Sequence, residues 1–478
     1  MIRFSREYLR DRIYACWVGK NIGGTLGTPF EGRHEMADIQ GFTSPPGEPL
    51  PNDDLDLQLV WLRAVEENGP WAINAKLLGE YWLSYINPNW NEYGVGKANM
   101  RDGILPPMSG EIDNDEWKNS NGAWIRSEIW ASLYPGLPGA AVRKGYEDAS
   151  VDHGLNEGTW AAMFTASMES AAFVIHDRDT LLDIGLSHIP KDCRVARSVN
   201  LVRDAYREGI PWRQVRPLLV QDSADLGWFQ APSNIGYVVL GLLYGENDFK
   251  KSLICAVDCT DDADCTGATL GALLGIINGM EGIPEDWRNY IGDGIVSKCM
   301  TNGHGRWPES CTELTDRVMA LLPVTLYEHR KWVSLGEEND FSDLDMRRMT
   351  DSPFTKFLSE LSPYSFRVSG IFADVTVEFE KEPVIQPLGE LRGSITMTCH
   401  TLPEQKHYHL DFQLPEGFGV QCRKNLFTPA LNSRAEQNTR TDFIIRAGED
   451  VQALNRGVIR IDSPGRVDQI LVPLVIRG

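Results

Sequence analysis

The sequence has little of what marks membrane, nucleic-acid-binding or disulfide-stabilised proteins. Its longest apolar stretches, near residues 235–243 and 270–277, are far shorter than the roughly 20 residues of a membrane-spanning helix. The N-terminal segment MIRFSREYLRDRIYACW lacks the basic region, apolar core and cleavage site of a signal peptide. Lys and Arg number 46 against 67 Asp and Glu, and the net charge of −21 opposes binding to nucleic acid or anionic membranes. Nine cysteines, an odd number, favour reduced thiols. We therefore expect a cytoplasmic protein without nucleic-acid or membrane partners.

The hydrophobic pattern changes once along the chain, whose 478 residues favour more than one domain. Up to about residue 333, apolar side chains recur every three or four positions, as in Trp160, Phe164 and Met168. After residue 365, short β-branched runs at 373–379, 394–399, 407–412, 441–445 and 458–461 alternate with turns. The sequence predicts an all-α domain over 1–340, a polar linker over 341–364 and a smaller β-sandwich over 365–478.

The densest group of acidic residues precedes a glycine-bearing apolar run that starts near residue 265. It consists of Asp258, Asp261, Asp262 and Asp264. Like charges this close repel one another unless a cation neutralises them, and hard divalent ions prefer such oxygen ligands. Asp262 and Asp264 can converge on one ion only from a loop or a first helical turn, because residues two apart do not share a helix face. An acidic loop or helix cap, favoured by the helix dipole, explains the same pattern.

A second acidic group, Asn52, Asp53, Asp54 and Asp56, leads into the apolar run 55–61. On this segment alone, capping of a helix by Asn52 or Asp53 is the simpler interpretation. The two acidic groups together indicate a metal site if the fold brings them into one cleft.

Two series of glycines spaced four residues apart indicate a close helix crossing. The series are Gly19, Gly23 and Gly27, and Gly267, Gly271, Gly275 and Gly279. Glycine costs a helix about 1 kcal/mol relative to alanine, so its repetition on one face implies that two backbones approach closely. One series ends near Glu31 and the other begins at Asp264, so both point to one centre. Packing of the core alone is the alternative.

Four segments resemble, in order, the motifs of the ADP-ribosylglycohydrolase family. GGTLGTPFE (23–31) resembles its opening Gly-Asp-Ala-x-Gly-x-Pro-x-Glu segment, and NDD (52–54) its Thr-Asp-Asp metal motif. SNGAWIR (120–126) resembles its Gly-Asn-Gly-Ala-x-Met-Arg loop, and DADC (262–265) its Asp-x-Asp-Thr motif. His153 follows Asp152 where that family has Thr-His. The resemblance covers the chain from about residue 10 to about residue 335.

The resemblance implies an orthogonal all-α bundle that holds two adjacent Mg²⁺ or Mn²⁺ ions, which engage the ribose hydroxyls of an ADP-ribosyl group. The implied metal ligands are Asn52, Asp53, Asp54, Asp262 and Asp264. The implied catalytic residues are Glu31, for proton transfer at the rim, and Asp53, between metal and water. The implied substrate-binding residues are Asn121, Gly122, Ala123, His153 and Glu157. Without the resemblance, His153 would be interpreted as a helix cap or a core residue, as is usual for a single histidine at a helix start.

Several positions depart from the family pattern. Asn52 and Cys265 replace threonine ligands, Leu55 replaces a further threonine, Gly24 replaces an aspartate, and Asp261 replaces a glycine. An amide oxygen suits Mg²⁺, whereas a thiol is a poor ligand for a hard cation, so either Thr266 compensates or the second ion binds more weakly. Extra charge at Asp261 would disfavour a pyrophosphate and favour a simpler ribosyl substrate, unless a metal or a basic residue offsets that charge.

These observations predict a metal-dependent hydrolase that cleaves an N- or O-glycosidic bond to ADP-ribose or a related ribosyl sugar. Its partner would be a small glycoside or an ADP-ribosylated substrate. One alternative is a glycosidase for furanosides, which the 14 tryptophans favour as stacking platforms, although most tryptophans serve as core. The other is a non-catalytic binder of ADP-ribose or ribosides. We expect the C-terminal domain to bind glycan, cap the cleft or mediate a homo-oligomer.

Overall fold

The computed structural model describes residues 1–300, 306–399, 406–428 and 437–478, which form two compact units. Unit 1 comprises Met1–Tyr93, Asp115–Ala149 and Leu155–Ser359. Unit 2 comprises Gly94–Asn114, Ser150–Gly154 and Glu360–Gly478. The division passes through helices α4 (Asn91–Arg101) and α6 (Pro138–His153), so each of these helices contributes residues to both units.

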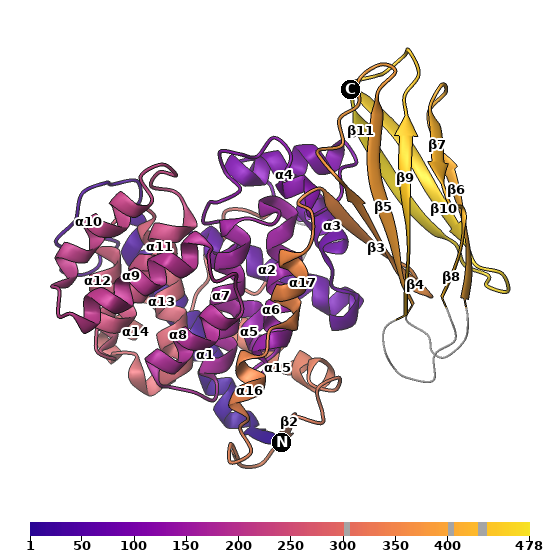
Figure 1. Ribbon diagram of the computed structural model, residues 1–478. Coiled ribbons are helices and arrows are strands. Elements are labelled where there is room, and N and C mark those ends of the chain that lie inside the picture. Colours follow the sequence, from indigo (N-terminus) through magenta and orange to yellow (C-terminus); the bar gives the residue numbers. More distant parts are fainter. Residues whose placement is uncertain (301–305, 400–405, 429–436) are drawn as a thin grey trace. The chain divides into compact units, whose positions relative to one another are not determined.

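Unit 1 is built from helices, as the apolar periodicity predicts (Figure 1). Besides its parts of α4 and α6, they are α1 (Arg6–Gly27), α2 (Asp53–Asn68), α3 (Ala75–Tyr85), α5 (Glu128–Leu133), α7 (Glu157–Ala172), α8 (Arg178–Ser187), α9 (Arg194–Arg207), α10 (Trp212–Asp222), α11 (Ala231–Tyr244), α12 (Phe249–Val257), α13 (Ala263–Asn278), α14 (Glu285–Ile291), α15 (Cys311–Thr325), α16 (Met346–Thr350) and α17 (Pro353–Ser359). The all-α prediction is confirmed apart from one short parallel pair, β1 (Ile2–Ser5) with β2 (Val333–Gly336). The segment expected to be a linker contains α16 and α17.

The crossing of α1 and α13 brings the two glycine series together. A Cβ atom at Gly23 would overlap the backbone carbonyl of Gly267, and one at Gly19 would overlap that of Gly271. A Cβ at Gly27 would overlap the carbonyl of Ala263, at the first turn of α13. The predicted close approach is confirmed, and it places the C-terminal end of α1 against the N-terminal end of α13.

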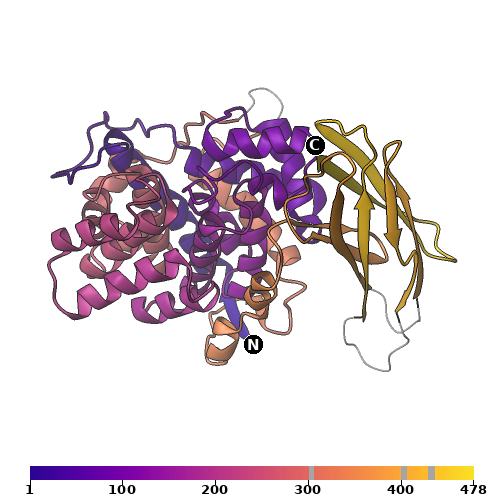
Figure 2. The ribbon, with the colours of Figure 1, turned by 45° about the horizontal axis from the view of Figure 1, so that its top comes forward.

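Unit 2 contains two antiparallel sheets, which confirms the predicted β-sandwich class (Figure 2). The first has the order β11 (Ile470–Arg477), β10 (Leu454–Asp462), β6 (Lys406–Gln413) and β8 (Asn425–Thr428). The second has the order β3 (Ser365–Ser369), β4 (Ala373–Phe379), β5 (Glu390–Cys399), β9 (Gln437–Arg446) and β7 (Gly419–Cys422). Inward side chains of both sheets, among them Val375, Ile395, Leu410 and Ile459, share one buried core.

The β-branched runs locate β4, β5, β6, β9 and β10, whereas β3, β7, β8 and β11 are missed. Strands β7 and β8 have four residues each, too few for alternation to stand out. Strand β11 contains Pro473, a residue that argues against a strand from sequence. β11 is an edge strand, where the missing N–H of proline is tolerated.

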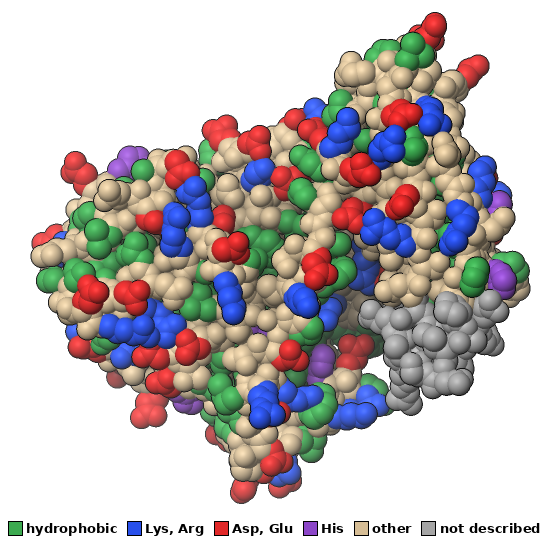
Figure 3. All heavy atoms as spheres, viewed as in Figure 1, with side chains coloured by type: hydrophobic (Ala, Val, Ile, Leu, Met, Phe, Trp, Pro, Cys, Tyr) green, Lys and Arg blue, Asp and Glu red, His purple; other side chains and the backbone are tan. Residues whose placement is uncertain are grey.

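The surface carries charges of both signs. On the face drawn in Figure 3, Asp and Glu side chains are scattered among Lys and Arg. Among the described helices, none combines the length and the apolar character needed to cross a bilayer.

Candidate active site

Helix α2 begins at Asp53, directly after Asn52, which caps it. The side-chain oxygen of Asn52 accepts a hydrogen bond from the backbone N–H of Asp54 at 2.8 Å. Asp53, Asp54 and Asp56 occupy the first turn, where the helix dipole favours negative charge. The capping interpretation is therefore confirmed, and it directs the Asp53 and Asp54 side chains from one helix end.

The departures at positions 24 and 52 are coupled in space. A Cβ atom at Gly24 would overlap the side-chain nitrogen of Asn52, so the absence of a side chain at position 24 makes room for the amide. Asn52 is 4% exposed, and its side-chain nitrogen has no hydrogen-bond partner among the described residues. Gly24 and Asn52 are therefore matched in space, at the two positions where the family pattern has an aspartate and a threonine.

Helix α13 delivers the second set of carboxylates from its first turn, as the spacing of Asp262 and Asp264 requires. Asp262 is the N-cap residue and Asp264 lies in the first turn. The backbone of the preceding loop pairs with the turn after α1 through an antiparallel bridge between Arg33 and Asp261. This bridge and the glycine crossing bring Asp264 near Glu31 and the start of α2.

Carboxylate groups from the two helix ends meet in two overlapping clusters. Ligand atoms of Asp53, Asp54 and Asp264 lie within 4.8 Å of one another, and so do those of Asp262, Asp264 and Cys265. One oxygen each of Asp54, Asp262 and Asp264 is buried without a hydrogen-bond partner among the described residues. An unpartnered buried carboxylate oxygen is unfavourable unless a cation pairs with it. The first cluster, all oxygen, therefore fits a hard divalent cation.

The electrostatics of the clusters favour the binding of a positive charge. Burial raises the pKa values of Asp54 and Asp262 well above their usual range, and the negative charge of Asp264 raises both further. Burial also raises the pKa of Asp264. Desolvation and mutual repulsion are the two physical reasons, and a bound divalent cation would relieve both.

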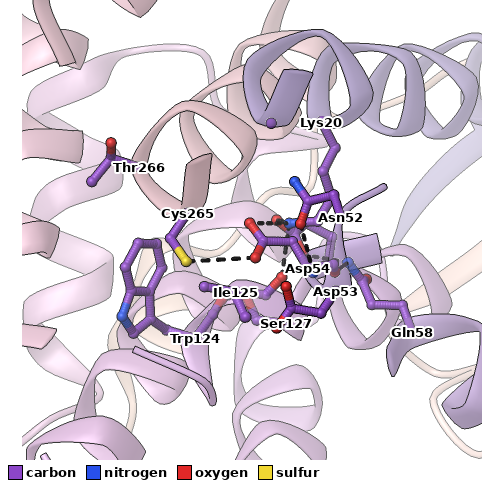
Figure 4. A network of polar contacts seen from close by, with 12 residues as sticks. Lys20, Asn52, Asp53, Asp54, Gln58, Trp124, Ile125, Ser127, Cys265 and Thr266 are labelled. Atoms are coloured by element: carbon purple, nitrogen blue, oxygen red, sulfur yellow. Dashed lines mark hydrogen bonds and ion pairs between the residues drawn. The ribbon is translucent and has the colours of Figure 1, made fainter. Parts of the chain in front are cut away.

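Two lysines lie near the clusters. Lys20, buried on α1, donates to Glu128 at 2.8 Å and to the carbonyl of Ile125 at 2.7 Å, and its Nζ lies 4.0 Å from Oδ2 of Asp54 (Figure 4). Glu128, which is closer than Asp54, is therefore the main counter-ion of Lys20. Lys298 lies with its Nζ 3.3 Å from Oδ1 of Asp53.

The backbone around Lys298 is fastened to α2. The N–H groups of Lys298 and Cys299 both donate to Oδ2 of Asp56, at 2.6 and 2.8 Å. Burial by itself lowers the pKa of Lys298, but Asp53 and Asp264 outweigh it, so the net pKa is raised and the ammonium stays charged. Asp56, three residues after Asp53, thus holds the segment that carries the Lys298 ammonium group beside the first cluster.

A cavity of about 630 Å³ opens onto the clusters. Its walls contain Glu31, Asp53, Asp262, Asp264 and Cys265, together with the aromatic side chains of Trp90, Tyr93, Trp117, Trp228 and Phe229. Among the lining residues that the structure describes, Lys298 is the one basic side chain. Glu31 is solvent-exposed, and the charge of Asp264, followed by partial desolvation, raises its pKa to about 7. A carboxyl group with this pKa can both donate and accept a proton near neutral pH.

The loop 120–126 contributes to one wall of the cavity and is held in place by side-chain hydrogen bonds. The side-chain N–H₂ of Asn121 donates to Oδ2 of Asp262 at 2.6 Å, and Trp124 donates to Oδ1 of Asn121 at 3.0 Å. Arg126 is buried, contacts the carbonyl of Gly122 and donates to Asp148 at 2.8 Å. Asn121 and Gly122 line the cavity, whereas Ala123 does not.

Two other predicted substrate-binding residues are absent from the cavity walls. His153 belongs to unit 2, is buried, and has its Nδ1 2.9 Å from Oδ1 of Asp152. Glu157 accepts hydrogen bonds from the backbone N–H groups of Arg194 and Val195, at 2.9 and 3.0 Å, at the start of α9. The carboxylate of Glu157 is thus engaged with a helix end.

The structure decides two alternatives that the departures leave open: a basic residue offsets the charge of Asp261, and Thr266 does not compensate for Cys265. Asp261 does not add unpaired charge to the cavity, because it accepts from Tyr237 at 2.8 Å and pairs with Arg216 at 3.3 Å. Thr266 does not replace the missing threonine ligand, because its hydroxyl donates to the carbonyl of Ala263 at 3.1 Å and lies away from the clusters (Figure 4).

Sequence reasoning missed both lysines. For Lys20 a signal exists, because a lysine directly after Gly19, within an apolar helix whose glycines mark a close crossing, must be buried and needs an acidic partner. Lys298 carries no such signal, since it lies in an irregular segment far along the chain from Asp53.

The helical bundle and its acidic cavity define an all-α protein with carboxylates placed to hold a cation. Residues 5–324 match the family ADP-ribosylglycohydrolase, so the chain belongs to that family. The chain is also similar to the ADP-ribosylarginine hydrolase Tri1 of Pseudomonas putida (strain GB-1), with 23% identity over 303 residues, which cover 59% of this chain and 74% of that protein. A solved structure described as an ADP-ribosylglycohydrolase-related protein complex covers 67% of this chain and 99% of its own, with 18% identity and a TM-score of 0.44.

Proposed function

We propose that this protein is a cytoplasmic, metal-dependent glycohydrolase that cleaves an N- or O-glycosidic bond to ADP-ribose or a related ribosyl sugar. The observation that carries the proposal is that Asp54, Asp262 and Asp264 each have one buried oxygen without a hydrogen-bond partner among the described residues. Asp262 and Asp264 line a cavity with aromatic walls. Membership of the family supports the hydrolase type and the ADP-ribosyl class of substrate.

Asn52, Asp53, Asp54 and Asp264 would hold a Mg²⁺ or Mn²⁺ ion. Such an ion, when bound, fixes neighbouring sugar hydroxyls and acidifies a water molecule. Asp53 would accept a hydrogen bond from the attacking water and orient it, while the Lys298 ammonium, 3.3 Å from Oδ1 of Asp53, holds that carboxylate in place.

Glu31 moves the proton at the scissile bond. Its carboxyl group is exposed to solvent and lines the cavity, so it can protonate a leaving group and then accept a proton back. The neighbouring carboxylates stabilise the positive charge that develops on the sugar ring. Asn121 and Gly122 shape the wall that receives the sugar, and the aromatic rings of Trp90 and Trp228, which are 48% and 37% exposed, offer stacking faces.

A glycosidase for neutral furanosides is the second candidate. It is favoured by the cavity walls, where aromatic rings accompany a single basic side chain among the described residues. A pyrophosphate would draw on Lys298 alone for an ion pair there, whereas a neutral sugar needs only stacking and hydrogen bonds. The charge of Asp261 no longer bears on this choice, since Arg216 pairs with it.

A substrate screen tests the proposal and separates the candidates. The full chain is incubated with arginine-linked and hydroxyl-linked ADP-ribose and with aryl ribofuranosides and arabinofuranosides, with Mg²⁺, Mn²⁺ or chelator. The arginine-linked compound is included because the Pseudomonas relative is named an ADP-ribosylarginine hydrolase. Turnover is expected to require the metal and to disappear in Asp264→Asn. Asp286→Asn is the matched control, because Asp286 is exposed and pairs with Lys250 away from the cavity.

The outcomes are distinct. Release of ADP-ribose supports the first candidate, and release of a free furanose supports the second. If the protein binds Mn²⁺ and ribosides tightly without turnover of any compound, a non-catalytic binder replaces both. Turnover that persists in chelator or in Asp264→Asn would contradict the metal-dependent mechanism.

A further inference from the structure

The two clusters at the active site differ in chemistry. The first, Asp53, Asp54 and Asp264, offers oxygen alone, whereas the second combines Asp262 and Asp264 with the sulfur of Cys265. All three residues of the second cluster are buried, with exposures of 1%, 4% and 6%. The second position therefore does not fit a hard cation such as Mg²⁺, for which a thiol is a poor ligand.

The sulfur of Cys265 is directed into the clusters. Cys265 lies in the first turn of α13, and its Sγ donates to Oδ1 of Asp54 at 3.5 Å (Figure 4). Thr266, the next residue, cannot supply a hydroxyl in its place, because it donates to Ala263. The sulfur is thus the third atom that the chain offers at this position.

Two buried oxygens complete the second position. Oδ1 of Asp262 and Oδ1 of Asp264 have no hydrogen-bond partner among the described residues, although both side chains are more than nine-tenths buried. Oδ2 of Asp262 is held by Asn121 at 2.6 Å, which fixes the orientation of the carboxylate. One carboxylate oxygen each of Asp262 and Asp264 lies within 4.8 Å of the other and of the sulfur of Cys265, which matches a mixed carboxylate and thiolate ligand set.

Building on the proposed function, we propose that the second cation position takes a thiophilic divalent ion of the Zn²⁺, Co²⁺ or Cd²⁺ class, while the first takes Mg²⁺ or Mn²⁺. On binding, the S–H bond of Cys265 breaks, its proton leaves to solvent, and a sulfur–metal bond forms.

The test uses Cd²⁺ as the probe and ultraviolet absorption as the readout. Bonding of a thiolate to Cd²⁺ gives a sulfur-to-metal charge-transfer band that oxygen ligands do not give. The full chain carries Cys422→Ser, because Cys422 is the one cysteine that is not buried, and is kept in saturating Mg²⁺. We expect the band to grow to one equivalent of Cd²⁺.

Three variants test whether the band comes from Cys265. Cys265→Ser, nearly the same size, is expected to abolish it and to weaken Cd²⁺ binding by at least about 100-fold, while Mn²⁺ binding at the first position persists. Cys299→Ser, the matched control, removes another buried thiol, one whose pKa Asp53 and Asp56 also raise, and is expected to leave the band unchanged. Cys265→Thr is expected to exchange the band for a second bound Mn²⁺, seen by electron paramagnetic resonance.

The possible negative results distinguish a failure of this inference from a failure of the proposed function. If the protein with Cys265 intact binds two Mn²⁺ ions and shows no Cd²⁺ band, the inference is overturned and the proposed function stands. If it binds neither kind of ion, both are overturned. A band that survives Cys265→Ser would place the thiophilic site elsewhere and overturn the inference.

Discussion

The crossing of α1 (Arg6–Gly27) and α13 (Ala263–Asn278) should tolerate no side chain at Gly23. In Gly23→Ala the new methyl group would overlap the backbone carbonyl of Gly267. A backbone atom cannot rotate away as a side chain can, so the helices must separate, by roughly 1 Å, to regain van der Waals distance. The substitution therefore perturbs the geometry of the whole crossing.

The magnitude follows from two opposing contributions. Overpacking a tight contact costs about 1–3 kcal/mol, and a contact with backbone belongs at the upper end. Alanine is a better helix former than glycine by about 1 kcal/mol, which offsets part of the loss. We expect Gly23→Ala to lower the free energy of unfolding by about 2 kcal/mol. Asp264, a proposed metal ligand, should also move away from Asp53 and Asp54, so Mn²⁺ affinity should fall as well.

Urea unfolding followed by circular dichroism measures the first effect, and calorimetric titration with Mn²⁺ measures the second. Gly139→Ala in α6 (Pro138–His153) is the control, because a Cβ atom there meets nothing within 4 Å. It should leave stability unchanged or raised. Equal stability of Gly23→Ala and the unmodified protein, or equal losses in both variants, would refute the idea that close backbone contact limits this crossing.

Three further predictions concern single side chains. Lys298→Met removes a positive charge 3.3 Å from Asp53 and should tighten Mn²⁺ binding at least about tenfold by calorimetry, whereas Lys298→Arg should not. Asn52→Ala removes the cap of α2 and should lower the free energy of unfolding by about 1 kcal/mol in urea, with no change contradicting the capping role. Burial lowers the pKa of His188, which hydrogen-bonds the carbonyl of Met349 at 2.9 Å. The folded state therefore binds fewer protons than the unfolded chain below about pH 6.5, so stability should fall on acidification, and urea titrations at several pH values should show a smaller fall in His188→Gln.

Local patterns were informative wherever a physical constraint acts within a few residues. The cap at Asn52, the first-turn carboxylates of α13 and the four-residue spacing of the glycines each depend on helix geometry, which the sequence states directly. Strand β4 (Ala373–Phe379) was located to the residue because its alternating side chains face a core on one side only. The motif order added the family, which none of these patterns carries alone.

Contacts between distant segments depended on the tertiary structure. Asp261 pairs with Arg216 and Tyr237, which joins α10 (Trp212–Asp222) and α11 (Ala231–Tyr244) to the loop before α13. No local sequence pattern predicts this pairing. A charge that seemed available to repel a substrate is therefore neutralised. The engagement of Glu157 with the start of α9 (Arg194–Arg207) likewise removes that carboxylate from the candidates for substrate contact.

The sequence by itself determined the helical and β-rich regions, the carboxylates available to a metal, and the pair of helices that must touch. These features follow from periodicity, capping and the small size of glycine, which act over one or two turns of chain. The tertiary structure decided which charges are paired, which carboxylate oxygens are left without partners, and that Lys298 lies beside Asp53. Burial and electrostatic pairing depend on every segment that surrounds a group, so they emerge only when those segments have come together.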